Sequence, residues 1–431
     1  MPQRNRFYPA QILTMIIPAL TGFLAIFAST IQARAADRKI QNSDLAIILP
    51  AQKNLRIAAL DVASPGKQTF LSEDLLQLVE KSYEETSVGD AMARENSHSD
   101  WTLVSLRVVP CSPLGVIPGP ETNLLCWPEI RLVWQPILKD FRRYAVILNW
   151  FADDRAIHAL YDAPTSLGLT TQQAQRAESL LSKVRMALAK SPVKPLSLLS
   201  ESDVNEFVKL RDSVSDALME KALSLRAANL TDSAYAKTLE RPEFNNSNEA
   251  PLFINRLKAF VASTTSTSGL KEMTSFSLPE GREPPQADEW VFLKYLKQNG
   301  RMNQVEIQVI SALDGRVLIN LGKSPKASQL RDDPQLHTAL ETMNAADAEE
   351  IKKRVLLSPQ DLGSKKIAIT DRAVSLVPNT TCASCHKFNS LRFDFHSLSY
   401  LEDRTISISP RVETDILRDL QWLQLRSQRQ E

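Results

Sequence analysis

The sequence predicts an α+β fold, with antiparallel sheets, packed helices and a small, mostly helical C-terminal module. Strand-like runs and helical runs occur in separate blocks, and no repeat of fixed period links them. Two hairpin signals, Asn299-Gly300 and Asp314-Gly315, lie between strand-like runs in the second half. The 431 residues are 43% hydrophobic and 23% charged, which is typical of globular chains with two or three domains.

The N-terminus has the layout of a secretory signal peptide. Arg4 and Arg6 precede an uncharged stretch at 12–31, which is followed by the small-residue triplet Ala33-Arg34-Ala35. We expect cleavage before Ala36, which makes residues 1–35 the signal peptide and the mature protein periplasmic or otherwise exported. The alternative is an uncleaved anchor that holds the protein at the membrane in the same compartment.

Residues 36–240 are expected to form an α+β domain. A helix at 71–83 begins after Ser72, a preferred N-cap residue. Strands are predicted at 101–109, 130–135, 143–149 and 156–161, followed by helices at 171–190 and 202–227.

Four cysteines fall into two pairs. Cys111 and Cys126 enclose a loop rich in proline and glycine between two predicted strands. In an oxidising compartment this spacing predicts a disulfide, which would contribute about 3 kcal/mol to the free energy of unfolding. The alternative is two buried free thiols.

Residues 241–285 have a polar, low-complexity composition that predicts a linker or loops. Two runs carry this signal, Asn245-Asn246-Ser247-Asn248 and the Ser/Thr run at 263–269. The next predicted unit, 286–362, is a three-stranded meander at 290–296, 304–310 and 317–321, followed by helices at 334–343 and 344–357.

The second cysteine pair belongs to Cys382-Ala383-Ser384-Cys385-His386, within a predicted module at 363–431. The C-x-x-C-H spacing is typical of covalent haem c attachment: two thiols add to the vinyl groups, and the next histidine becomes the proximal iron ligand. The competing interpretations are half of a zinc site, a C-x-x-C redox pair, or coincidence. Only His396 lies near enough in sequence to serve as a further zinc ligand.

Through Cys382, Cys385 and His386 the chain resembles the c-type cytochromes, over about its last 60 residues. The resemblance implies one covalent haem c and an electron-transfer role with a redox partner protein, rather than enzymatic catalysis. In that family a methionine downstream supplies the sixth iron ligand, but no methionine follows His386 here. One motif in the whole chain also excludes multihaem electron carriers and two-haem peroxidases.

The sixth iron ligand has a nearby candidate in His396, which follows His386 by ten residues. A chain of ten residues spans up to about 35 Å when extended, enough to pass round the haem edge. His396 can equally be an ordinary packed or solvated histidine. Met343, Met302 and His337 are the more distant candidates.

The chain ends in a predicted amphipathic helix. Ser409 is its N-cap and Pro410 its first residue, and Val412, Ile416, Leu420 and Leu423 recur at helical spacing. We expect this helix to cover the haem or to close the module against the larger domain, or simply to pack.

The balance of charges and the motifs that the sequence lacks exclude several classes of function. The chain has 51 basic and 50 acidic residues, so no overall positive field attracts nucleic acid. No hydrolase elbow, zinc-protease motif, dinucleotide fingerprint or P-loop occurs. Three functions remain: a monohaem electron carrier, a haem-based ligand sensor or peroxide-reacting protein with an open sixth position, and an exported non-redox binding scaffold.

Overall fold

A computed structural model gives the fold of most of the first two thirds of the chain and of its last helix. It describes residues 39–50, 55–62, 71–84, 101–114, 124–136, 150–151, 156–191, 194–235, 241–277, 281–282, 291–298, 300–305, 308–313, 316–321, 328–329 and 410–428. The signal peptide, the strand predicted at 143–149 and the helices predicted at 334–343 and 344–357 lie outside these residues.

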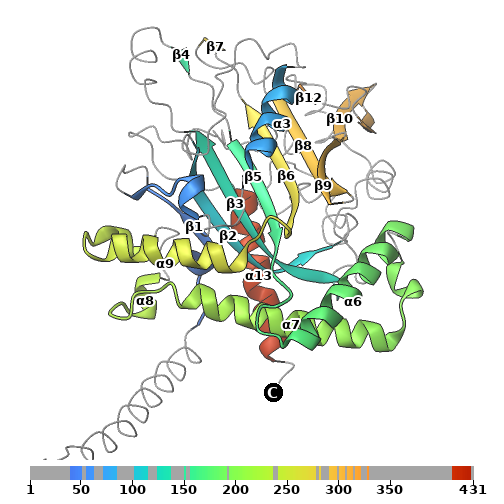
Figure 1. The fold of residues 1–431 in the computed structure, drawn as a ribbon, viewed down its shortest axis with the longest axis horizontal. Coiled ribbons are helices and arrows are strands. Elements are labelled where there is room, and N and C mark those ends of the chain that lie inside the picture. The colour runs from blue at the N-terminus through green and yellow to red at the C-terminus, as the bar shows by residue number, and fades with distance from the viewer. Residues whose placement is uncertain are drawn as a thin grey trace, which may run out of the picture. The chain divides into compact units, whose positions relative to one another are not determined.

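The fold is α+β, as predicted, and is built on one antiparallel sheet of eight strands (Figure 1). The strand order is β1-β2-β3-β5-β6-β8-β12, and β9 pairs with β8 off this path. The bounds are β1 Ala46–Ile48, β2 Trp101–Pro113, β3 Cys126–Pro136, β5 Ala156–Asp162, β6 Leu270–Ser277, β8 Val291–Gln298, β9 Arg301–Val305 and β12 Ser328–Gln329. The strands predicted at 101–109, 130–135 and 156–161 are confirmed, and each is longer than predicted.

The first helices follow their capping signals. In α3 (Glu73–Glu84), Ser72 Oγ accepts a hydrogen bond from the Leu75 amide at 3.3 Å. Helix α6 (Thr171–Lys190) has the predicted bounds, because Thr170 and Gln173 form a reciprocal capping box. Helix α7 (Glu201–Leu223) ends earlier than predicted, since the prediction extended it to residue 227. Beyond its end, the Arg226 side chain donates to Asp44 and the Ala227 amide donates to Glu243, both in a buried polar network.

The predicted linker at 241–285 is wrong for most of its length. This segment contains the short 3₁₀ helix η6 (Pro242–Asn245), helix α9 (Glu249–Thr264) and strand β6. Phe253, Leu257 and Phe260 bury the apolar face of α9, and that burial outweighs the polar composition at its ends. Since β6 lies between β5 and β8, the predicted units 36–240 and 286–362 share one sheet and are not separate domains in the described part of the chain.

The predicted three-stranded meander is instead two hairpins. Strands β8 and β9 are joined through Asn299-Gly300, where Gly300 has a φ of +80° that favours glycine. Strands β10 (Gln308–Leu313) and β11 (Arg316–Leu321) form a second antiparallel pair. The strand predicted at 304–310 is therefore divided after Val305. A further two-stranded sheet pairs β4 (Trp150–Phe151) with β7 (Gly281–Arg282).

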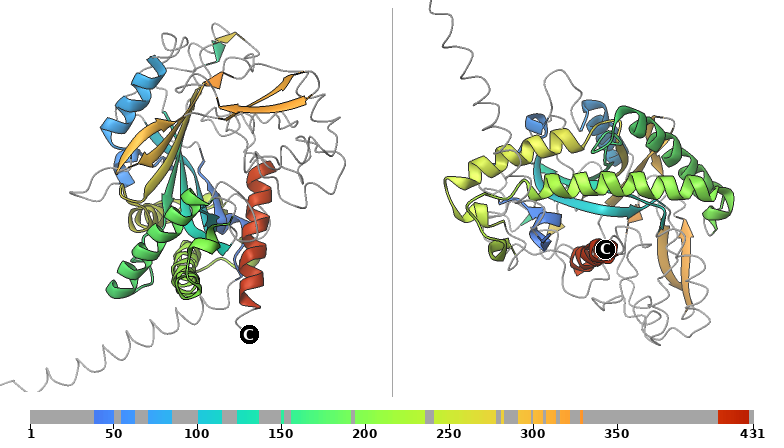
Figure 2. Two further views of the ribbon diagram at one scale, coloured as in Figure 1. Left: turned by 90° about the vertical axis from the view of Figure 1, so that its right-hand side faces the viewer. Right: turned by 90° about the horizontal axis from the view of Figure 1, so that it is seen from below.

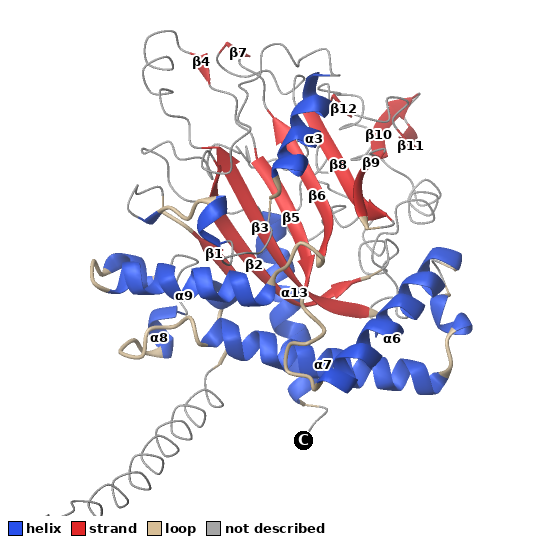
Figure 3. Ribbon diagram, in the orientation of Figure 1, coloured by secondary structure: helices blue, strands red, loops and turns tan. Residues whose placement is uncertain are grey.

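Helices lie on both sides of the β1–β3 end of the main sheet (Figures 2 and 3). Helix α7 contacts β2 and β3, and its Phe207 ring lies 5.7 Å from the Trp127 ring in the core. Helix α13 (Pro410–Ser427), which begins at Pro410 as predicted, contacts β2 from the side opposite α9.

The short helices are α2 (Asn42–Leu45), α8 (Asp232–Tyr235), η2 (Ala59–Val62) and η5 (Pro195–Leu198). Within the described ranges no helix has the length and apolar character needed to cross a bilayer.

Candidate functional site

The predicted haem ligands lie outside the described residues. Cys382, Cys385, His386 and His396 fall between β12 and α13, as do His337 and Met343. Met302 is described: it lies half-buried on β9, opposite Lys297 of β8. Among the residues that the structure places, no group of three or more His, Cys, Asp or Glu side chains could hold a metal ion. The haem site therefore stays a prediction.

The helix that follows the motif is attached to the sheet by a buried charge cluster. Arg107 of β2 donates hydrogen bonds to Asp415 at 2.9 Å and to Asp419 at 2.6 Å, and all three side chains are buried. Burial is the largest influence on Asp419 and raises its pKa, while the charge of Arg107 acts in the opposite direction. Arg418 also pairs with Asp415 at 3.0 Å from the solvent side.

Sequence reasoning missed this charge cluster. The predicted apolar stripe places Ile416 in the core, but Leu420 and Leu423 are only half-buried, and Leu417 is 62% exposed. Asp415 and Asp419 lie one turn apart, so they share a face of α13, and Arg107 is the one cation in an otherwise apolar run at 106–109. A paired acid face on the helix and a lone cation in a buried strand were the available signals.

The disulfide predicted between Cys111 and Cys126 is confirmed, with Cα atoms 5.2 Å apart. It joins the end of β2 to the start of β3. Arg211 of α7 reaches it: Nη1 donates to the Leu124 carbonyl at 2.7 Å and to Cys126 Sγ at 3.5 Å. The same guanidinium lies 5.6 Å from the ring centroid of Trp422, on α13. One arginine thus contacts both the disulfide and the C-terminal helix.

A second charge cluster crosses β3, β5 and β6. Glu129 is buried between Arg131 and Lys271, and its carboxylate lies 2.5 Å from Lys271 Nζ. Burial opposes its ionisation, but the two cations outweigh burial and lower the pKa of Glu129 to about 2. Burial, and then the charge of Arg131, lower the pKa of His158 to about 4. His158 is therefore neutral at pH 7.

A third cluster of charged side chains, which is buried, anchors the first described helix, α2. Asp44 of α2 pairs with Arg226 and with Arg241, the latter at 3.0 Å. Arg241 also binds Glu243 at 2.8 Å, and Tyr235 donates to Glu243 at 2.9 Å. Each carboxylate here has a cationic partner and further hydrogen bonds, which is the arrangement of a structural joint.

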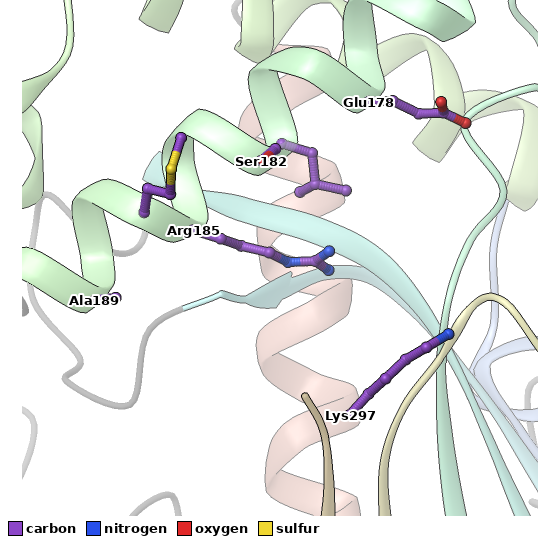
Figure 4. A pocket seen from close by; sticks show the side chains of 7 residues that line it. Glu178, Ser182, Arg185, Ala189 and Lys297 are labelled. Atoms are coloured by element: carbon purple, nitrogen blue, oxygen red, sulfur yellow. The ribbon is translucent and has the colours of Figure 1, made fainter. Parts of the chain in front are cut away.

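The described residues also form an open pocket of about 690 Å³ between α6 and β8 (Figure 4). Arg185 and Lys297 point into it, and the apolar side chains of Leu181 and Met186 also line it. Both cations already have partners. Arg185 pairs with Asp162, and Lys297 donates to the Ser268 carbonyl at 2.5 Å.

Compared with known protein families, curated proteins and solved structures, the chain matches none. Function therefore has to be argued from the residues themselves.

Proposed function

We propose that the chain is an exported, monohaem c-type cytochrome-like protein that transfers electrons to or from a redox partner protein. The observation that carries the proposal is the Cys382-x-x-Cys385-His386 motif. A second observation supports export: the chain has a disulfide, which an oxidising compartment permits, and an N-terminal sequence typical of a signal peptide.

The donor set of the motif fits the group. Cys382 and Cys385 would hold haem c through thioether bonds, and His386 would bind its iron from the proximal side. The haem would supply a one-electron couple whose potential depends on the ligand opposite His386. A structural zinc site would need two more Cys or His ligands at close spacing, and His396 is the only such residue near the motif in the sequence.

A second function is a haem-based sensor or peroxide-reacting protein with an open sixth position. The absence of methionine from residues 387–431 favours this alternative, because the ligand that usually fills the sixth position in the resembled family is missing there. The two functions differ in iron spin state, and a visible spectrum separates them.

Haem staining after denaturing electrophoresis tests the proposal. The full chain, expressed with a cytochrome maturation system, should keep its haem on the gel, because thioether bonds survive denaturation. The variant Cys382→Ala/Cys385→Ala should lose the stain. The matched control is Cys111→Ala/Cys126→Ala, which removes the same number of thiols and should stain like the parent per unit of protein.

Two results would overturn the proposal. One is a parent chain that reaches the periplasm without staining, and the other is staining that persists in the Cys382→Ala/Cys385→Ala variant. Sequencing of the mature N-terminus checks the export step, for which Ala36 is expected as the first residue.

A further inference from the structure

The two sulfurs of the Cys111–Cys126 disulfide lie in different surroundings. Arg211 Nη1 donates to Cys126 Sγ at 3.5 Å in a buried contact. Both cysteines are buried, and Cys111 is the more exposed of the two, at 9% against 2% for Cys126. A thiolate at Cys126 would accept a hydrogen bond from a buried cation. Among the residues that the structure describes, no cationic side chain donates such a bond to Cys111.

Arg211 is held in place by other groups. Its Nε and Nη2 donate to Asp212 Oδ1 at 2.8 and 2.6 Å, and its Nη1 donates to the Leu124 carbonyl. Trp422 of α13 lies beside the guanidinium. These contacts leave Nη1 directed at the sulfur, so the cation need not be reorganised when the sulfur becomes charged.

We propose that the Cys111–Cys126 disulfide is a directional thiol–disulfide exchange site, in which a thiolate donor attacks Cys111 and Cys126 is the leaving group. The proposal is independent of the haem.

The chemistry requires an external dithiol as the reductant. Its thiolate attacks Cys111 Sγ, the Cys111–Cys126 bond breaks, and the bonding electron pair leaves on Cys126 Sγ as a thiolate beside Arg211. The second thiol of the donor, after losing its proton to solvent, attacks the donor sulfur of the mixed disulfide and releases Cys111. Two electrons pass to the protein, the donor becomes a disulfide, and the released thiolates take up protons from water according to pH.

The positive charge of Arg211 sets the direction of attack. A neighbouring cation favours the thiolate over the thiol, and a more stable thiolate leaves faster. The carboxylate of Asp212 partly neutralises the positive charge of Arg211. Removing this carboxylate should therefore stabilise a Cys126 thiolate further while the guanidinium stays in place.

The first test measures the rate of native-state reduction by dithiothreitol, with the Cys111 and Cys126 peptides quantified by alkylation and mass spectrometry. Arg211→Gln should be reduced about threefold to tenfold more slowly than the parent. Asp212→Asn should be reduced faster. Loosened packing would accelerate reduction in both variants, so slower reduction of Arg211→Gln cannot be an effect of destabilisation.

The second test needs no variant. The parent is treated with the monothiol glutathione and quenched with iodoacetamide, which caps the released thiol. Glutathione should be found on Cys111 and the alkyl group on Cys126. The proposal would be overturned by adducts divided equally between the two cysteines, by adducts mainly on Cys126, or by reduction that occurs only in denaturant. Each of these results would count against it whether or not Arg211→Gln folds.

Discussion

His158 lies in the middle of β5, opposite Val133 on one side and Thr274 on the other. Burial and the charge of Arg131 keep it neutral far below the ordinary histidine range, with a pKa of about 4. The unfolded chain would bind a proton at this histidine near pH 6.5. The residue therefore makes stability depend on pH from about 6.5 downward, and the upper part of this range lies above the ordinary pKa values of carboxylates.

The sign of this dependence follows from the two pKa values. The stabilisation is complete above pH 6.5 and is lost as the pH falls from 6.5 to 4, because the unfolded chain takes up the proton first. In the parent, the free energy of unfolding should fall as the pH drops through this range. In His158→Gln it should fall less, and the difference between the two proteins should reach up to about 3 kcal/mol. Urea unfolding at pH 7 and pH 4.5 measures it, and parallel profiles for parent and variant would contradict the expectation.

Glu129 acts in a lower pH window. Its pKa is lowered from 4.5 to about 2, so its contribution is present above pH 4.5 and is lost between pH 4.5 and 2. Glu129→Gln should make the loss of stability below pH 4.5 less steep and leave the slope between pH 6.5 and 4.5 unchanged. A circular-dichroism acid titration compares it with His158→Gln, and identical profiles for the two variants would contradict the assignment of separate windows.

At the scale of elements, α13 shows how a few buried charges fix a whole helix. Arg107 binds two aspartates that lie one turn apart, so the helix has one rotation about its axis in which both pairs form. At the other end of the helix, Arg426 pairs with Asp212 at 3.5 Å and with Asp216 of α7. Among the apolar side chains of α13 whose burial the structure describes, only Ile416 is fully buried, so the charges are the main contacts that fix the register of the helix.

Removing the central cation should therefore be costly. Arg107→Met removes the buried cation that binds both carboxylates: Asp419 loses its salt bridge to Arg107, and Asp415 keeps its pair with Arg418 on the solvent side. The free energy of unfolding should fall by about 3 kcal/mol or more. Arg418→Met is the matched control: Arg418 binds the same Asp415, but its side chain is 49% exposed, so the loss should stay below about 1 kcal/mol. Urea denaturation measures both, and equal losses would show that burial of the pair is not the cause.

Elements with local signals were predictable, and those fixed by tertiary burial were not. Thr170 and Gln173 determine where α6 starts without help from the rest of the chain. Helix α9 is different, because Asn245–Asn248 and the Ser/Thr run at 263–269 carry turn signals while Phe253 and Leu257 between them meet the core. The pairing of Arg107 with Asp415 joins residues 308 positions apart. Local patterns mark each group as unusual, but they do not show that the two groups meet.

At the scale of the whole molecule, the proposed haem segment leaves the sheet at β12 and rejoins it at α13. The motif itself was readable because haem c attachment needs a fixed local spacing of two thiols and an imidazole. The sixth ligand has no such local signature, since any histidine or methionine that folding brings to the iron can serve.

His396→Ala tests the nearest candidate. If His396 binds the iron, a low-spin visible spectrum should become high-spin, and the variant should bind carbon monoxide readily; bis-histidine ligation should also give a lower potential than His/Met ligation. His337→Ala is the matched control and should keep the parent spectrum. A His396→Ala spectrum and potential equal to those of the parent would exclude His396 and direct the search to Met343, Met302 and His337.

The packing of α13 against β2 has a consequence for biosynthesis. Arg107 is 308 residues ahead of Asp415, and at about 5–20 residues per second its partners are made about 15–60 s after it. During that interval the neighbouring strands can pair, but the cation on β2 has only water as a counterpart. A nascent or prematurely terminated chain that lacks α13 would therefore leave this charged face of β2 without the helix that covers it in the complete fold.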